Sequence, residues 1–353
     1  MRPPPLAAVF VIALADLASD VAAQTAYTWR AIVLHPPGAY RSEAYGVSLS
    51  GVSGYIEAGD DPNIDGASLW PSRVRPLIQL HPEAWAVSRV QGADAALQCG
   101  YVNSIIDGVS HVHAALWSHS PASFTDLHPA DYFTSAATDA DGNLVVGRIR
   151  ISASDRAALW RLDNAGSVVD LHPAGASWSE AWATDGSWQG GQAAMQGTIV
   201  AVLWQGTAAS AVVMHDPGGS FKTSQINGMA PGAQVGSALL FQPLRDHAIL
   251  WRDTPESWID MHPSFHPNKN SYMFATTGDL HVGRSNGRAG IWFGDDPDSF
   301  HDLHQYVPGS PSGSNADDIA IRAGRVYVAG RATFTRTQAV VWIGTPVSAS
   351  PQR

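Results

Sequence analysis

The chain has 353 residues, of which 45% are hydrophobic and 15% charged, and its net charge is −10. This composition is typical of a folded globular protein and excludes a disordered chain. The acidic balance, with Lys222 and Lys269 as the only lysines, argues against nucleic acid as a partner, because phosphate backbones are bound by basic surfaces. No apolar stretch is long enough to cross a bilayer, so we expect no membrane span.

The N-terminal segment has the pattern of a secretory signal. Arg2 supplies a positive start, Leu6 to Ala15 forms a short apolar stretch, and small residues end at Ala23. We therefore expect a signal peptide over residues 1–23 and a secreted or periplasmic protein. Cys99 is the sole cysteine, which excludes an internal disulfide, and its strand-like surroundings predict a buried thiol.

Two landmarks recur along the rest of the chain. A Trp closes a short apolar run, and a His-Pro-like element follows 11 or 12 residues later, as from Trp117 to His128 and from Trp160 to His172. The Trp positions are Trp70, Trp117, Trp160, Trp204, Trp251, Trp292 and Trp342. The His positions are His35, His81, His128, His172, His215, His262 and His304, spaced 42 to 47 residues apart.

Each repeat contains four apolar runs of strand length. Asp-Gly at 141–142 and 185–186 and Gly-Asp at 278–279 fall between the first two runs, where a tight hairpin needs positive φ. No window keeps helical spacing of its apolar residues for more than two turns. Four short antiparallel strands in a repeat of this length are typical of a propeller blade.

The order of the landmarks predicts how the ring closes. The series begins with His35 and ends with Trp342, so residues 27–34 form a fourth strand without its first three, and residues 314–343 form three strands without a fourth. Pairing them completes a seventh blade and removes exposed sheet edges. We predict an all-β, seven-bladed β-propeller of four-stranded blades over residues 24–346, followed by a disordered tail at 347–353.

The repeated residues are interpreted as structural. A Trp in every third strand would fill the space between neighbouring blades. Each His ends an outermost strand, so the seven imidazoles would lie apart on the rim and shape the crossing to the next blade, which argues against a shared metal. Four acids that precede Leu-His or Met-His are interpreted as solvent-facing or turn-bonding groups: Asp126, Asp170, Asp260 and Asp302.

The repeat resembles the HAF-repeat family of bacterial extracellular proteins. That family's unit opens with a His-Ala-Phe-Leu-Trp element and closes with Gly-x-Val-Val-Gly. Residues 113–117 (His-Ala-Ala-Leu-Trp) and 247–251 (His-Ala-Ile-Leu-Trp) match the opening, and Leu-Val-Val-Gly147 matches the close. Leu-His-Pro stands where the family has Leu-Gly. The resemblance covers residues 27–343 and implies a secreted repeat protein, without implying a reaction.

Polar residues on the innermost strands are the candidate ligand-binding groups. The candidates at a channel mouth are Glu43, Asp139, Glu180, Asp185 and Asp317. They could bind a ligand or act as general acid and base. His111 and His281 lie off the repeated position and are the better catalytic candidates among the histidines. No known catalytic or metal-site motif is present, so no cofactor is expected apart from a possible calcium ion.

That calcium site would use a loop that is not repeated. Asp61, Asn63 and Asp65 place oxygen ligands at alternate positions before Gly66, as at the start of a calcium loop. The acid expected at the twelfth position is replaced by Ser72. A simple Asp/Asn-Gly turn is the alternative and the favoured interpretation.

The function favoured by these patterns is a secreted, monomeric binding or scaffold propeller that contacts a protein or glycan through its loops and channel mouth. Four tryptophans outside the repeat could form a carbohydrate platform, although packing between blades is at least as good an explanation: Trp85, Trp178, Trp182 and Trp188. The alternative is a secreted hydrolase or lyase with its site in the central funnel, an analogy from fold alone.

Overall fold

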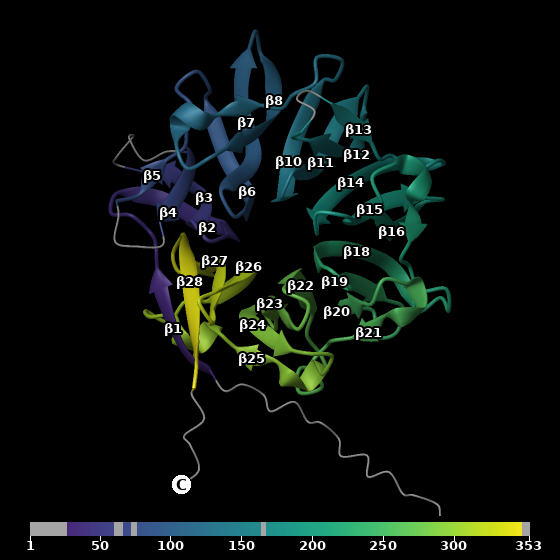
Figure 1. Cartoon of the computed structure of the whole chain (residues 1–353). Coiled ribbons are helices and arrows are strands. Elements are labelled where there is room, and N and C mark those ends of the chain that lie inside the picture. Colours follow the sequence, from purple (N-terminus) through teal and green to yellow (C-terminus); the bar gives the residue numbers. More distant parts are fainter. Residues whose placement is uncertain (1–26, 60–65, 72–75, 164–166, 348–353) are drawn as a thin grey trace, which may run out of the picture.

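The structure, a computed structural model, describes residues 27–59, 66–71, 76–163 and 167–347. Seven four-stranded antiparallel sheets stand in a ring, each radiating from the centre as one blade (Figure 1). The predicted seven-bladed β-propeller is confirmed. The expected signal peptide, the calcium loop with Asp61, Asn63 and Asp65, and residues 348–353 lie outside the described residues.

Each blade runs from an innermost to an outermost strand in chain order. The first comprises β2 (Ala39–Val47), β3 (Gly51–Ala58), β4 (Gly66–Pro71) and β5 (Ile78–Gln79). The second and third comprise β6 (Val87–Asp94), β7 (Leu97–Ile106), β8 (Val109–Trp117) and β9 (Thr125–Asp126), then β10 (Thr134–Asp141), β11 (Leu144–Ile151), β12 (Ser154–Arg161) and β13 (Val168–Asp170). The fourth and fifth comprise β14 (Ala176–Thr184), β15 (Gln189–Met195), β16 (Thr198–Trp204) and β17 (Val212–Val213), then β18 (Phe221–Ala230), β19 (Ala233–Leu240), β20 (Asp246–Trp251) and β21 (Ile259–Asp260). The sixth comprises β22 (Ser271–Thr276), β23 (Leu280–Ser285), β24 (Arg288–Phe293) and β25 (His301–Asp302).

The seventh blade closes the ring with both ends of the chain. β26 (Gly313–Arg322), β27 (Arg325–Thr333) and β28 (Thr337–Pro346) are joined by β1 (Tyr27–Val33) as the outermost strand. β1 pairs antiparallel with β28 from Tyr27 opposite Pro346 to Val33 opposite Val340 (Figure 1). The Trp29 ring covers Gly344, where an added Cβ would come within 2.7 Å of it. This is the closure predicted from the order of the landmarks.

The repeated Trp residues fill the core between blades, as predicted. Five of them are completely buried, Trp160 is nearly so, and Trp70 is partly exposed. The cluster around Trp342 combines Ile291 of the sixth blade with Val328 of the seventh. The Trp342 indole also donates to the carbonyl oxygen of Leu303 at 2.8 Å, just before the landmark His304. At this junction, packing and hydrogen bonding therefore join adjacent sheets at the same place.

Every landmark His forms a hydrogen-bonded bridge between two blades. Its Nδ1 lies 2.8–2.9 Å from the Oγ of a Ser on the innermost strand that follows. That Oγ accepts from the N–H of the Ala three residues before the Trp of the preceding blade. The bridging pairs are His35–Ser42, His81–Ser88, His128–Ser135, His172–Ser179, His215–Ser224, His262–Ser271 and His304–Ser314. We call this arrangement the His–Ser bridge.

The hydrogen-bond partners of the imidazole show which atoms of the His–Ser bridge donate and which accept. Nε2 of His172 and of His215 lies 3.0 Å from a backbone carbonyl oxygen, which can only accept. Nε2 therefore carries the hydrogen, Nδ1 accepts from the Ser hydroxyl, and the hydroxyl oxygen accepts from the Ala N–H. Burial lowers the pKa of His128, His215 and His262, which favours the neutral imidazole that this pattern requires.

Of the two roles predicted for the acids before the landmark His residues, solvent-facing or turn-bonding, the structure shows turn bonding. One oxygen of Asp126 accepts from the N–H of His128 at 2.8 Å, and the other oxygen lies 2.8 Å from His113 Nδ1. One oxygen of Asp170 likewise accepts from the N–H of His172, and its other oxygen pairs with Arg156. These carboxylates fix the turn that delivers the imidazole to its Ser.

The His–Ser bridge predicts that Ser135→Ala lowers the free energy of unfolding by about 1–3 kcal/mol, because the buried Ala114 N–H loses its acceptor and His128 Nδ1 its donor. Chemical denaturation of both variants measures the loss. The control is Ser187→Ala, an exposed position whose hydroxyl has no hydrogen-bond partner among the described residues. Equal effects at the two positions would contradict a structural role for the bridge.

Candidate functional site in the central channel

The innermost strand of every blade carries a β-bulge at the same place. Three residues after the bridging Ser, the pairing with the second strand skips one residue. The seven skipped residues, which we call the bulge ring, are Tyr45, Gln91, Thr138, Trp182, Asn227, Phe274 and Asp317. Bulges redirect side chains, and all seven of these residues line one cavity in the channel.

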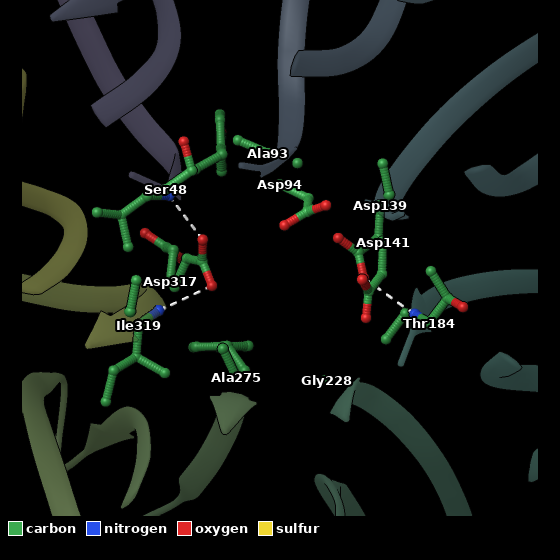
Figure 2. Close-up of a pocket in the computed structure, with 18 of the residues that line it drawn as sticks. Ser48, Ala93, Asp94, Asp139, Asp141, Thr184, Gly228, Ala275, Asp317 and Ile319 are labelled. Atoms are coloured by element: carbon green, nitrogen blue, oxygen red, sulfur yellow. Dashed lines mark hydrogen bonds between the residues drawn. The ribbon is translucent and has the colours of Figure 1, made fainter. Parts of the chain in front are cut away.

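This central cavity has a volume of about 360 Å³ and is lined by the innermost strands of all seven blades. Its polar lining combines five carboxylates with neutral polar side chains, and Figure 2 shows Asp94 and Asp141 across the channel from Asp317. The carboxylates are those of Asp94, Asp139, Asp141, Asp317 and Asp318. Its aromatic lining includes Trp182, whose side chain is 37% exposed. The cavity thus combines hydrogen-bond acceptors with an accessible indole.

Two of these acids occupy equivalent positions and join neighbouring blades. Asp139 and Asp318 each follow the bulge residue directly. Asp139 accepts from the N–H of Thr184 on the next blade at 2.9 Å (Figure 2). Asp318 accepts from the N–H of Val47, also on the next blade, at 2.6 Å. Burial raises the pKa of Asp139 to about 7 and that of Asp318 to about 8, although these backbone hydrogen bonds oppose the shift.

The remaining carboxylates differ in their partners. Asp94 accepts from the N–H of Gly142 on the third blade at 3.0 Å. Burial raises the pKa of Asp141, and the negative charges of Asp94 and Asp185 raise it further. Burial also raises the pKa of Asp317 to about 6, against the opposing charge of Arg331 at 3.2 Å. The cavity therefore holds acids that exchange protons near neutral pH.

The structure brings together two of the five candidate ligand-binding residues. Asp139 and Asp317 line the central cavity. Glu43 lies in the other half of its strand, is 2% exposed, and accepts from Arg41 and from the Tyr45 hydroxyl. Glu180 lies at the equivalent position two residues before a bulge residue, and it accepts from Arg148 of the preceding blade at 3.3 Å.

Asp185 is the fifth candidate, and it stabilises a turn. Its Oδ1 accepts from the N–H groups of Ser187 and Trp188, at 2.9 and 2.7 Å, in the turn between β14 and β15. It lies close enough to the cavity to affect the pKa of Asp141, but it is not part of the lining.

The two catalytic candidates among the histidines, His111 and His281, are not part of the lining of the central cavity. His281 is completely buried and shares a hydrogen bond of 2.7 Å with Thr276. Burial lowers its pKa to about 4. His111 lies on β8, the third strand of its blade. Neither imidazole is exposed in the lining of the cavity.

The sequence interpretation missed the bulge ring and the role of Asp318. The signal for both is the Ser that follows each landmark His, because it fixes the register of the innermost strand. The third residue after this Ser is the bulge residue in every blade, so Trp182 and Asp317 could have been placed in one ring by counting. The bulge itself has no signature in the composition of these segments.

Metal ligands and membrane spans were also sought in the structure. Within the described ranges, no group of three or more His, Cys, Asp or Glu side chains is arranged to hold a metal ion. Over the same ranges, no helix has the length and apolar character that would let it span a membrane.

Comparisons with known proteins identify related folds only. No protein-family model and no curated protein matches the chain. A solved structure of puromycin hydrolase is similar at a TM-score of 0.55 and 11% identity, over 89% of this chain and 55% of that one. The β-propeller domain of the Trilobed protease from Pyrococcus furiosus, described as having an open velcro topology, is similar at 0.51 and 7% identity, over 89% and 97%.

These likenesses support the propeller fold and leave the activity open. The chain spans about half the length of the puromycin hydrolase structure. The ring closure by β1 and β28 contrasts with the open topology described for the protease domain.

The pKa of Asp318 predicts a stability profile with a definite sign. Folding raises this pKa from 3.8 to about 8. The contribution of Asp318 to the free energy of unfolding is therefore complete below pH 3.8, the pKa in the unfolded chain, and is lost as the pH rises to about 8. Asp318→Asn should flatten the fall in unfolding free energy between about pH 5 and pH 8. Denaturation at several pH values measures the slope. Asp131→Asn, at an exposed position, should keep the wild-type slope, and an unchanged slope in Asp318→Asn would contradict the assignment.

Proposed function

We propose that this protein is a secreted binding propeller that takes a neutral, polyhydroxylated ligand, a glycan, into the central cavity. The observation on which this proposal rests is the joint lining of that cavity by the exposed indole of Trp182 and by carboxylates. The volume of about 360 Å³ falls in the range of small-molecule sites. The signal-like segment at 1–23 and the resemblance to HAF-repeat proteins support secretion.

The chemistry of the lining suits sugar hydroxyl groups. Carboxylate oxygens accept hydrogen bonds from hydroxyls, and Asp94 and Asp141 both face the cavity (Figure 2). An indole offers a large flat apolar surface with a polar edge, on which the C–H face of a sugar ring can stack. Trp182 belongs to the platform suggested by the sequence, whereas Trp178 lines a separate pocket with Arg150 and Arg156.

A hydrolase is the second candidate, and the raised pKa of Asp317, about 6, favours it. A carboxyl group that holds its proton near neutral pH can act as a general acid. However, Asp139 and Asp318 already accept backbone hydrogen bonds between blades, and Asp317 is paired with Arg331. Binding is therefore better supported than catalysis. Turnover of aryl glycosides that is lost in Asp317→Asn would establish the hydrolase instead.

Binding in the central cavity predicts that Trp182→Ala and Asp141→Asn each weaken glycan binding about tenfold or more. The first removes the stacking surface, and the second replaces a charged acceptor oxygen with an amide donor. A glycan array identifies the ligand, and isothermal titration calorimetry measures its Kd. Trp178→Ala is the matched control, because it removes a half-buried indole from the same strand outside the cavity. Full binding by Trp182→Ala, or equal losses in both Trp variants, would reject the cavity as the site.

A further inference from the structure

A second group of cavities lies at the other half of the innermost strands. One, of about 240 Å³, lies between the sixth, seventh and first blades, and another, of about 350 Å³, adjoins it on the sixth blade. They share Arg284 and Gly287. Arg41, Lys269, Arg284 and Arg331 bring four positive charges, and Glu43 is the one carboxylate in the lining. We call this region the arginine mouth. It is basic although the chain has a net charge of −10.

The charges of the arginine mouth are unequally paired. Arg41 and Arg331 both lie beside Glu43, and Arg331 also lies 3.2 Å from Asp317. Arg284 lies within 4.0 Å of no carboxylate of the described residues, although its positive charge acts over a longer distance to lower the pKa of Asp317. Its guanidinium lies 4.7 Å from the centre of the Tyr272 ring and donates to Asn315 Oδ1 at 3.2 Å. Arg284 is thus held in place by neutral groups.

Comparison of the blades shows that an expected counter-charge is missing. Arg148, Arg284 and Arg331 each follow the landmark Gly on the second strand of their blade. Arg148 meets Glu180 of the next blade at 3.3 Å, and Arg331 lies 3.9 Å from Glu43 of the next blade. Glu180 and Glu43 each follow a bridging Ser directly, and the residue at that place for Arg284 is Asn315.

A half-buried cation without an acid partner loses hydration without full compensation. The position of Arg284 at the junction of two cavities leaves room for an anion to supply the missing charge. Guanidinium groups bind carboxylates in a planar, often bidentate geometry. The rest of the lining offers amides and hydroxyls of Asn270, Asn286, Thr333 and Thr337, which suit sugar hydroxyl groups.

We propose that the arginine mouth is a second binding site, independent of the central cavity, which takes the carboxylate of a sugar acid on Arg284. The carboxylate of the ligand takes the place of the acidic side chain that Glu180 and Glu43 provide at their own junctions and that Asn315 lacks. The hydroxyl groups of the sugar contact the neighbouring amides and threonines.

The experiment is calorimetric titration of the full chain with D-glucuronate, with D-glucose as the neutral probe and inorganic phosphate as the second anion. Glucuronate should bind at least about tenfold more tightly than glucose, and the binding should weaken with added salt. Equal affinity for glucose, or no binding of glucuronate, overturns the proposal. Phosphate binding as tight as that of glucuronate overturns the assignment to a sugar acid.

Two variants locate the site. Arg284→Gln removes the cation, and Asn315→Asp supplies the missing charge without changing the shape of the side chain. Each should raise the Kd for glucuronate about tenfold or more. Arg148→Gln is the matched control, because it removes the equivalent arginine, which already has its acid, and it should bind as the wild type does.

Thermal unfolding of each variant tests whether it is folded. Retained binding in both Arg284→Gln and Asn315→Asp overturns the proposal. Trp182→Ala should leave glucuronate binding unchanged, so failure of the arginine mouth and failure of the central cavity are distinguishable.

Discussion

The fold depends on the hydrogen bond by which each landmark His holds a Ser of the next blade. Blades of a propeller share no continuous backbone ladder, so most contacts between them come from side chains. The His–Ser bridge supplies an acceptor for an N–H of one blade from the first strand of the next, and it occurs at all seven junctions. The Trp packs beside it and excludes water, which strengthens the hydrogen bonds.

The same bridge sets what lines the channel. Because the Ser is fixed against the preceding blade, the bulge three residues later always falls at the same depth. The bulge ring then delivers residues as different as Trp182, Thr138 and Asp317 to one cavity. Structural constraint is thus confined to the bridge and the indoles, and the bulge positions are free to vary. Any ligand specificity resides in these variable positions, since the propeller fold by itself defines no function.

Charge is distributed unevenly along the channel axis. One half holds carboxylates whose pKa is raised by burial, and the other holds arginines that are only partly paired. Part of this charge has a structural use, as in the hydrogen bonds of Asp139 and Asp318 to the next blade. The pairing of Arg148 with Glu180 shows how a junction is neutralised when an acid is present. Asn315 marks the junction where this neutralisation is incomplete.

The sequence by itself determined the blade count, the strand order, the ring closure and the structural role of Trp342 and His304. These features repeat at a regular spacing, so they can be counted and ordered without the structure. It also indicated that Asp139 and Asp317 face the channel, although it gave Glu43, Glu180 and Asp185 the same role. Only the tertiary structure decided that Glu43 and Glu180 meet arginines of the preceding blade, that Asp185 stabilises a turn, and that Trp182 enters the central cavity while Trp178 does not. The physical reason is that these outcomes depend on which side of a bulge a residue falls and on what the neighbouring blade places opposite it, and both are contacts between residues far apart in the chain.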